Sequence, residues 1–429
     1  MPTMLLLTMF LLAMSAGAAP VATDLRENIA WLKRNASPIR TVDPADEDWT
    51  DLEPIGRAIG DARMVMLGEG SHGDGTTFLF KSRLIRFLHQ QHEFGVIVWE
   101  APFYEAYAVG GDARRDPQEL TFKRAGIFSA SAQSAPTLAY IKASWKTGKP
   151  ITLVGLSQYV QVDGPIFSDV ISFFEKVDST WPTHEQRDAF RSLREHINRA
   201  AFRRPQEPVT PPQQARLRAM MKLIDEDPNG RIVAAHGKRR TALMRRVLEN
   251  IDAYAEAMYR PVSRGGTDDN PWAAQEARNL LFWANDYFPN RKLIVWAHSA
   301  HTSRQNATME ELGAKWGTAE MVPLGDHAYR AFGDDVYSIM FLAHSGKFAQ
   351  IGREPRDIPP PRDDSLEAMM HEAGFKTAFL DLRHLPSGHW LQEPQVASPM
   401  AYQPLRAPWP KCFDAIVYID QMQPATRGE

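Results

Sequence analysis

Four short, mainly apolar runs most constrain how this chain can fold. They occupy residues 65–67, 95–100, 151–156 and 292–297; the second ends in Glu100, and the others are followed by glycine or polar residues. Runs without polar alternation are typical of strands that are buried on both faces. Helical segments separate the runs, and this alternation favours parallel strands with crossover helices. We therefore predict an α/β fold with a mainly parallel central sheet flanked by helices.

The segments between and after these runs predict the flanking elements. Phe80, Leu84, Phe87 and Leu88 recur at helical spacing and predict a helix over residues 76–92 with one apolar stripe facing the sheet. Similar patterns predict helices at 24–35, 49–59, 135–145, 270–287 and 366–373. Further strands are expected at 336–341, 377–380 and 413–419, and a proline-rich loop at 353–362.

Between about residues 160 and 260 the strand pattern gives way to charge-rich helical segments. Two long ones, 185–201 and 231–259, are separated by proline-rich breaks at 203–214 and near 228. We interpret this region as a helical insertion that frames the active-site cleft of one domain spanning 19–429. Its aromatic residues could line that cleft or pack in the core, and the core reading is favoured; they are Phe167, Phe173, Phe174 and Phe190.

The first 18 residues are interpreted as a signal peptide. Residues 4–14 are apolar but too few to span a bilayer, and Ala16-Gly17-Ala18 fits a cleavage site. Because the preceding residues contain no Lys or Arg, a buried N-terminal helix is the alternative. We expect an exported protein, periplasmic or secreted, with no stable membrane insertion after cleavage.

Composition narrows the classes of partner and cofactor. The formal net charge is −3, so the chain lacks the basic excess typical of nucleic-acid-binding proteins. Cys412 is the only cysteine, which excludes an intrachain disulfide and a cysteine zinc cluster. We expect no nucleic-acid partner.

Reactive side chains follow three of the predicted strands. Glu69 and His72 come after the first strand in a glycine-rich loop, Glu100 ends the second, and His298 and His301 follow the late one. Because the carboxyl ends of parallel strands share one edge of a sheet, we expect all five to lie together. Each of them alone could instead be a structural residue, such as a packed histidine or a capping carboxylate.

These residue types favour a hydrolase in which histidine activates water. A neutral imidazole can take a proton from water, and a carboxylate at its other nitrogen fixes the tautomer. No Gly-x-Ser-x-Gly elbow signals a serine nucleophile. His298-x-x-His301 has a spacing that could bind metal, but it lacks both cysteine partners and a His-Glu-x-x-His helix. We therefore expect no metal and no cofactor.

Several motifs, in order, resemble the erythromycin esterase family. They are Gly68-Glu69-Gly70-Ser71-His72-Gly73, the 81–88 helix, Trp99-Glu100-Ala101 with Glu105 and Ala106, Val295 to His301, residues 325–341 and residues 413–417. The resemblance implies an α/β core with a helical insertion and metal-independent hydrolysis of a macrolide lactone in members that give resistance. Its site pattern carries over to Glu69, His72, Lys81, Glu100, His298 and His301.

Two departures from the family pattern fall near the expected cleft. Trp272-Ala273 and Glu276-Ala277 stand where the family usually has Arg-Asp and Met-Ala, and Ser157 stands where an acidic residue is common. These changes bear on the identity of the substrate more than on the hydrolytic core.

The predicted function is hydrolysis of a carboxylic ester, and a macrolide lactone is the expected substrate. His72 is the predicted general base, Glu69 or Glu100 orients it, and Lys81 with His298 or His301 stabilises the oxyanion. Lys81 could equally be a solvated helix residue. Two alternatives stay open, an esterase acting on an envelope polymer and an exported carrier of a small molecule, metal or tetrapyrrole. The carrier would bind its ligand through His72, His298 and His301.

Overall fold

The computed structural model describes residues 25–111, 130–161, 164–178, 183–202, 211–257, 271–315 and 317–428. The predicted signal peptide lies outside these ranges. Among the described residues, none of the helices combines the length and the apolar character needed to cross a bilayer.

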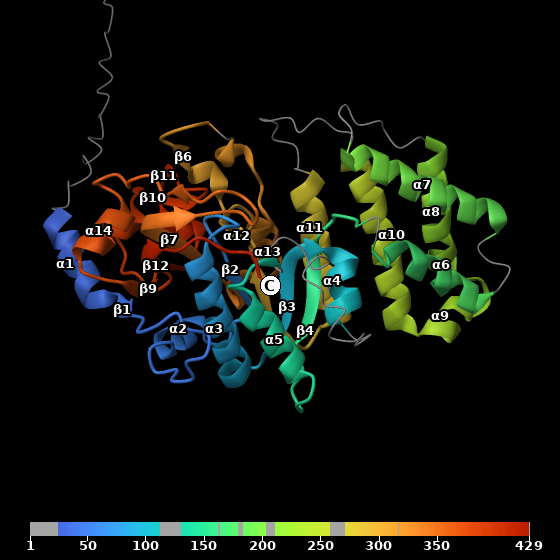
Figure 1. Cartoon of the computed structure of the whole chain (residues 1–429), viewed down its shortest axis with the longest axis horizontal. Helices are drawn as coiled ribbons and strands as arrows, with labels where there is room; N and C mark the ends of the chain where they lie inside the picture. The colour runs from blue at the N-terminus through green and yellow to red at the C-terminus, as the bar shows by residue number, and fades with distance from the viewer. Residues whose placement is uncertain are drawn as a thin grey trace, which may run out of the picture.

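A large, mainly parallel sheet forms the centre of the fold and confirms the predicted fold class (Figure 1). Its strand order is β1-β9-β12-β7-β2-β5-β3-β4, and β8 pairs with β7. The parallel strands are β2 (Met64–Leu67), β3 (Phe94–Pro102), β4 (Thr152–Ser157), β5 (Lys292–Trp296), β7 (Val336–Phe348) and β12 (Ala415–Met422). The antiparallel additions are β1 (Ser37–Pro38), β8 (Arg356–Asp357) and β9 (Thr377–Asp381).

The central strands are buried on both faces, as their uniform apolar character predicts. In β2, Met64 and Met66 join one core cluster, whereas Val65 and Leu67 join another on the opposite face. The helices around the sheet are α1 (Leu25–Asn35), α2 (Glu53–Ile59), α3 (Gly75–His92), α4 (Phe103–Gly110), α5 (Ala135–Ser144), α11 (Pro271–Leu281), α12 (Ser299–Thr302), α13 (Leu324–Phe332), α14 (Leu366–Glu372) and α15 (Trp409–Cys412).

A group of helices lies beside the sheet at the right of Figure 1. It comprises α6 (Ile166–Val177), α7 (His184–Phe202), α8 (Pro211–Glu226), α9 (Arg231–His236) and α10 (Lys238–Ala257). The single helix predicted over 231–259 is wrong, because Gly237 takes a φ of +75° and separates α9 from α10. The aromatic residues singled out in this region are buried in the core, at Phe167, Phe173, Phe174 and Phe190.

Several other boundaries differ from the predictions. The helix predicted over 270–287 ends at Leu281 and continues as a π-helical turn over Phe282–Tyr287. The last strand runs from 415 to 422, and the strand that begins at Val336 extends to Phe348. A small antiparallel sheet was not predicted; its strands are β6 (Glu310–Glu311), β10 (Gln395–Met400) and β11 (Gln403–Ala407).

Candidate active site

The carboxyl ends of β2, β5 and β3 meet at one edge of the sheet. Trp296 at the end of β5 is in register with Leu67 of β2 and Trp99 of β3, so the residues that follow these strands emerge together. The backbone N–H of Ser299 donates to the Glu69 carbonyl at 2.9 Å and ties the two loops. All five residues predicted at this edge lie in one connected cluster, and Lys81 joins it from α3.

His72 is held from behind by a buried carboxylate. Its Nδ1 lies 3.2 Å from Glu69 Oε1, and the Glu69 side chain has no exposed surface. The other carboxylate oxygen contacts Lys81 Nζ, which also donates to the Leu67 carbonyl at 2.8 Å. Lys81 is fully buried, with Nζ 5.0 Å from the centre of the Trp296 ring. The lysine therefore neutralises Glu69 from inside the protein and does not face solvent.

Glu100 lies between two imidazoles. Its Oε1 is 3.5 Å from His72 Nε2 and 3.4 Å from His301 Nε2, and its Oε2 accepts a hydrogen bond from the His298 backbone N–H at 2.7 Å. The side chains of His72, Glu100 and His301 retain 20%, 14% and 22% of their exposure. Together with His298, which is also partly exposed, these three side chains form the part of the cluster that a ligand can reach.

His301 has a second carboxylate partner that sequence reasoning did not assign to the site. Its Nδ1 lies 3.0 Å from Oε2 of the buried Glu276 on α11. The indole Nε1 of Trp272 donates to the other oxygen of Glu276 at 3.0 Å. The sequence did contain a signal for this contact. Trp272 and Glu276 both depart from the family pattern, and because they lie four residues apart they share one face of a helix.

His298 shapes the loops and has both ring nitrogens engaged. Its Nδ1 accepts from the Ala300 backbone N–H at 3.0 Å, so Nε2 carries the proton and donates to the Gly70 carbonyl at 2.8 Å. Burial, together with the nearby His72, lowers the pKa of His298 to about 4. His298 is thus neutral at neutral pH and joins the start of α12 to the loop after β2.

His72 and His301, the other two histidines of the site, hold protons more tightly than usual. Burial disfavours the imidazolium of His72, but Glu100 and Glu69 outweigh it and raise the pKa above 6.5. Burial also disfavours the imidazolium of His301, but Glu276 and Glu100 outweigh burial and raise the pKa of His301 well above 6.5. Burial likewise opposes ionisation of Glu100, yet His301 and His72 hold its pKa far below the usual range. His301 is therefore an imidazolium paired with carboxylates at neutral pH.

The loop carrying Glu69 and His72 is fixed by close backbone packing. Gly73 lies so near the backbone of Ala349 that a Cβ atom would come within 2.3 Å of its carbonyl carbon. Asp74 is buried and accepts hydrogen bonds from the Ser71 N–H at 2.9 Å and the Tyr402 hydroxyl at 2.6 Å. Burial raises the pKa of Asp74 to about 7. Close packing and buried hydrogen bonds thus hold the loop that carries Glu69 and His72.

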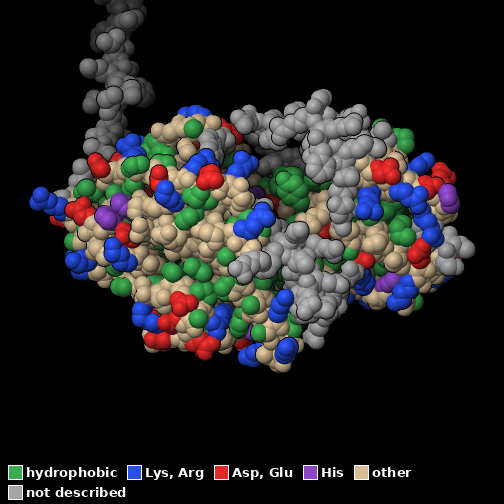
Figure 2. Space-filling model, viewed as in Figure 1, with side chains coloured by type: hydrophobic (Ala, Val, Ile, Leu, Met, Phe, Trp, Pro, Cys, Tyr) green, Lys and Arg blue, Asp and Glu red, His purple; other side chains and the backbone are tan. Residues whose placement is uncertain are grey.

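Aromatic side chains border the His301 side of the site. The Tyr159 ring is 53% exposed and packs edge-on against Trp272, with ring centres 4.7 Å apart. Figure 2 shows hydrophobic side chains in a hollow between the sheet and the helices α6–α10, while acidic and basic residues are interspersed over the face in view. An exposed aromatic surface beside the charged cluster suits an amphipathic ligand.

The cluster contains side chains of the kinds that bind metal ions. Donor atoms of Glu69, His72 and Glu100 lie within 4.8 Å of one another. The buried ammonium of Lys81 already contacts Glu69 and supplies the positive charge that a cation would bring. The predicted carrier ligands do not converge either, because His298 directs its nitrogens to backbone groups. These residues therefore fit a resident metal poorly.

The chain is similar to known proteins along most of its length. A profile of the family described as erythromycin esterase matches residues 89–422. Glu100, Glu276, His298 and His301 lie inside this range, whereas Glu69, His72 and Lys81 precede it. The chain is 21% identical over 426 residues to YbfO of Bacillus subtilis (strain 168), provisionally named a hydrolase, covering 92% of this chain and 91% of that one. It is 23% identical over 420 residues to erythromycin esterase type II of Escherichia coli, covering 91% and 97%.

Solved structures share the fold. A Bacillus cereus protein superposes with a TM-score of 0.77 at 18% identity, covering 95% of this chain and all of that one. A histidine-to-asparagine variant of the erythromycin esterase EreC, in its open conformation, gives a TM-score of 0.63 at 17% identity, with 90% and 97% covered. The family profile spans most of the sequence and the two relatives align along nearly all of it, so this chain belongs to the erythromycin esterase family.

Proposed function

We propose that the protein hydrolyses a carboxylic ester with water activated by His72 and without a resident metal. One observation carries this proposal. His72 presents Nδ1 to the buried Glu69 and turns Nε2 toward the accessible side of the site, 3.5 Å from Glu100. An imidazole oriented by a carboxylate at one nitrogen can accept a proton at the other, as in hydrolases that use a histidine base.

The first step forms a bond between the water oxygen and the ester carbonyl carbon. The water proton passes to His72 Nε2, and the carbonyl electron pair moves onto oxygen to give the tetrahedral oxyanion. Glu69 stabilises the imidazolium that forms, because its carboxylate accepts a hydrogen bond from the Nδ1–H group. Collapse of the intermediate breaks the bond to the alcohol oxygen, which takes the proton back from His72. The products are a carboxylic acid and an alcohol, which remain one molecule if the substrate is a lactone.

The geometry revises two of the predicted roles. Lys81 is buried behind Glu69, so we assign it to holding that carboxylate and not to the oxyanion. His298 directs both ring nitrogens to backbone groups and is neutral, so we assign the positive charge that stabilises the oxyanion to His301, whose ring nitrogens face Glu100 and Glu276. Removal of a single oxyanion donor typically costs 10² to 10³-fold in rate.

A macrolide lactone is the proposed substrate. Support comes from the name of the Escherichia coli relative and from the family to which the chain belongs. The exposed Tyr159 and its contact with Trp272 offer an apolar surface for a bulky ring. The product would be the ring-opened hydroxy acid. An ester of an envelope polymer is the alternative substrate, and export through the predicted signal peptide belongs to the same proposal.

Mass spectrometry of the pure protein with macrolides and simple esters tests the proposal. We expect one compound to gain the mass of one water, and His72→Ala to lose this activity while folding normally. His384→Ala, at an exposed histidine bonded to Asp381, is the matched control. Full activity in His72→Ala would contradict the assignment. A stoichiometric transition metal that disappears with His72→Ala would favour the carrier instead.

A further inference from the structure

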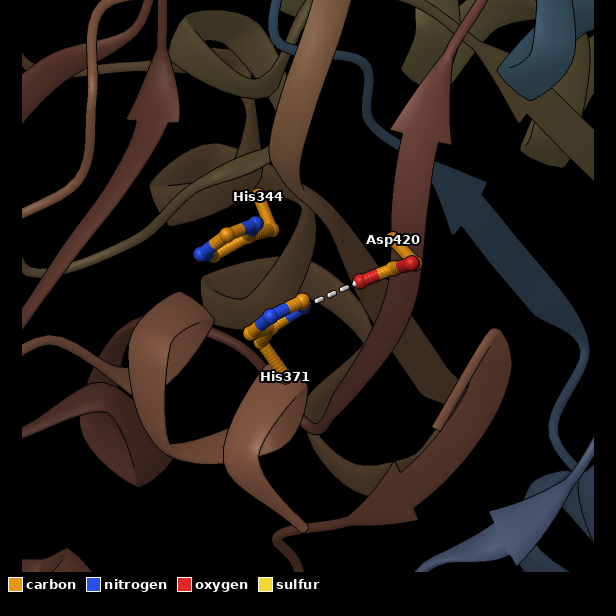
Figure 3. Close-up of side chains that lie close together, drawn as sticks. All are labelled: His344, His371 and Asp420. Atoms are coloured by element: carbon orange, nitrogen blue, oxygen red, sulfur yellow. Dashed lines mark hydrogen bonds and ion pairs between the residues drawn. The ribbon is translucent and has the colours of Figure 1, made fainter. Parts of the chain in front are cut away.

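A second cluster of reactive side chains lies away from the candidate active site. His344 on β7, His371 on α14 and Asp420 on β12 bring three donor atoms within 4.8 Å of one another (Figure 3). The cluster shares no residue with the site described above. No step of the proposed hydrolysis uses it.

The fold explains why these three residues meet. β7 and β12 are parallel, and the pairing of Ala343 with Ile419 and of Ser345 with Gln421 sets Asp420 beside His344. Alternate residues of both strands point to one core cluster, through Leu342 and Tyr418, so His344 and Asp420 continue that face beyond its apolar part. Helix α14 packs over this face and adds His371 from the opposite side.

The three side chains are in close contact. His371 Nδ1 lies 2.6 Å from Asp420 Oδ1. The rings of His344 and His371 stack with centres 3.9 Å apart and planes only 2° from parallel. His344 Nδ1 is buried and has no hydrogen-bond partner. A buried polar nitrogen without a partner requires an explanation, and a bound ion is one of the explanations.

Outer contacts hold the carboxylate in place. The Tyr418 hydroxyl donates to Asp420 Oδ1 at 3.0 Å, and Lys376 Nζ lies 2.7 Å from Oδ2. The Lys376 side chain is 86% exposed, so it can move away from the carboxylate at little cost. Hydrogen-bonded carboxylates of this kind are typical neighbours of metal-binding imidazoles.

We propose that His344, His371 and Asp420 bind one divalent transition-metal ion of the class that prefers imidazole ligands, with Zn²⁺ as its representative. The ion replaces the proton shared by His371 Nδ1 and Asp420 Oδ1, which is released to solvent. Zinc needs ligand distances of about 2.0 to 2.2 Å, so the stacked rings rotate out of parallel to direct lone pairs at the ion. Because His371 is half exposed, water completes the coordination.

The consequence of such a site is structural. It ties β7, α14 and β12 together, and the chain after β12 reaches the catalytic loop, where the Ala425 N–H donates to the Gly73 carbonyl at 2.8 Å. Metal binding would therefore brace the strand that supports this loop. An ion that binds only the folded protein raises its melting temperature in proportion to the logarithm of metal concentration.

Calorimetric titration of the full chain with Zn²⁺ tests the proposal. All proteins in the comparison carry His72→Ala, which removes binding by Glu69, His72 and Glu100. In this background we expect one saturable site, weakened at least about tenfold by His371→Ala or His344→Ala, since each removes a ligand. His384→Ala is the matched control, because His384 also lies 2.8 Å from an aspartate, Asp381, but belongs to no group of three donors among the described residues.

Thermal unfolding supplies a second readout that does not depend on activity. Zn²⁺ should raise the melting temperature of the parent and of His384→Ala, and should leave that of His371→Ala unchanged. Equal Zn²⁺ affinity in His371→Ala and His384→Ala would overturn the proposal, as would absence of binding in the parent. In the otherwise unmodified protein His371→Ala should keep its ester hydrolysis, so failure of the metal site and failure of the proposed function are distinguishable.

Discussion

The site contains two histidine–carboxylate pairs that share Glu100 and differ in what lies behind them. Behind His72 stands Glu69, whose charge is neutralised by the buried ammonium of Lys81. Behind His301 stands Glu276, which is supported by the neutral indole N–H of Trp272. A carboxylate that is already paired attracts a neighbouring proton less strongly than one that is not.

This difference divides the work between the two imidazoles. The pKa of His72 is raised, mainly because Glu100 and Glu69 outweigh burial, whereas Glu276 and Glu100 raise that of His301 much further. We infer that His72 loses its proton at a lower pH than His301 and acts as the base, while His301 remains a cation. The same two residue types thus supply a proton acceptor and a positive charge, both in contact with Glu100.

The largest effect should come from removing the base. His72→Ala should reduce kcat/KM by roughly 10² to 10⁴-fold, because a positioned general base typically contributes that much. His301→Ala should lose about 10² to 10³-fold, the usual cost of a lost oxyanion donor. Steady-state kinetics on the identified ester measure both. Losses in the reverse order would break the division of labour between the two pairs.

The second largest effect should be on the stability of the protein when the lysine that contacts Glu69 is replaced. Lys81→Met removes the buried cation that pairs with the buried Glu69 and should lower the free energy of unfolding by about 3 to 5 kcal/mol. Urea denaturation measures the change. Adding Glu69→Gln should recover part of the loss, since the double variant no longer buries a charge. Additive losses in the double variant would show that the two side chains are not coupled.

A smaller effect concerns the pH profile. Activity should rise as the pH increases through the pKa of His72, because the base must be neutral. It should fall as the pH increases through the higher pKa of His301, because His301 must be charged. Glu276→Gln removes the main anion that stabilises the imidazolium, so the pKa of His301 drops and the falling limb moves to lower pH. The rising limb should stay in place. An unchanged falling limb would exclude His301 as its source.

The smallest effect should come from the indole. Trp272→Phe keeps the ring but removes the N–H that donates to Glu276, a loss of about 1 kcal/mol or roughly fivefold in kcat/KM. Trp145→Phe is the matched control, because its indole N–H donates to the Ile151 carbonyl on the far side of the fold. The control should leave kcat/KM unchanged. Equal losses in both variants would point to a general destabilisation.

The strand ends of the site could be predicted from the sequence because period and register are local properties. Apolar runs indicated parallel strands, and parallel strands bring Glu69, Glu100 and His298 to one edge. Glu276 could not be placed in this way, since it comes from a helix that reaches the site only through tertiary packing. The burial of Lys81 is also a tertiary effect, because the helical pattern around it carries no sign of the partner behind β2.

The His344 cluster shows the same limit more strongly. Its three residues lie on two strands and a helix, and no short motif joins them in the sequence. The hairpin of β10 and β11 was missed because Pro399 and Pro404 disfavour strands, while Ala401 and Tyr402 take positive φ at its turn. Pairing with β6, far away in the sequence, stabilises it.

NMR titration of the individual imidazole resonances, assigned with His72→Asn and His301→Asn, tests the central claim most directly. We expect His301 to be an imidazolium at neutral pH and to lose its proton only well above 6.5, after His72 has lost its own. A neutral His301 at neutral pH, or deprotonation of His301 before His72, would contradict the proposed division between base and cation.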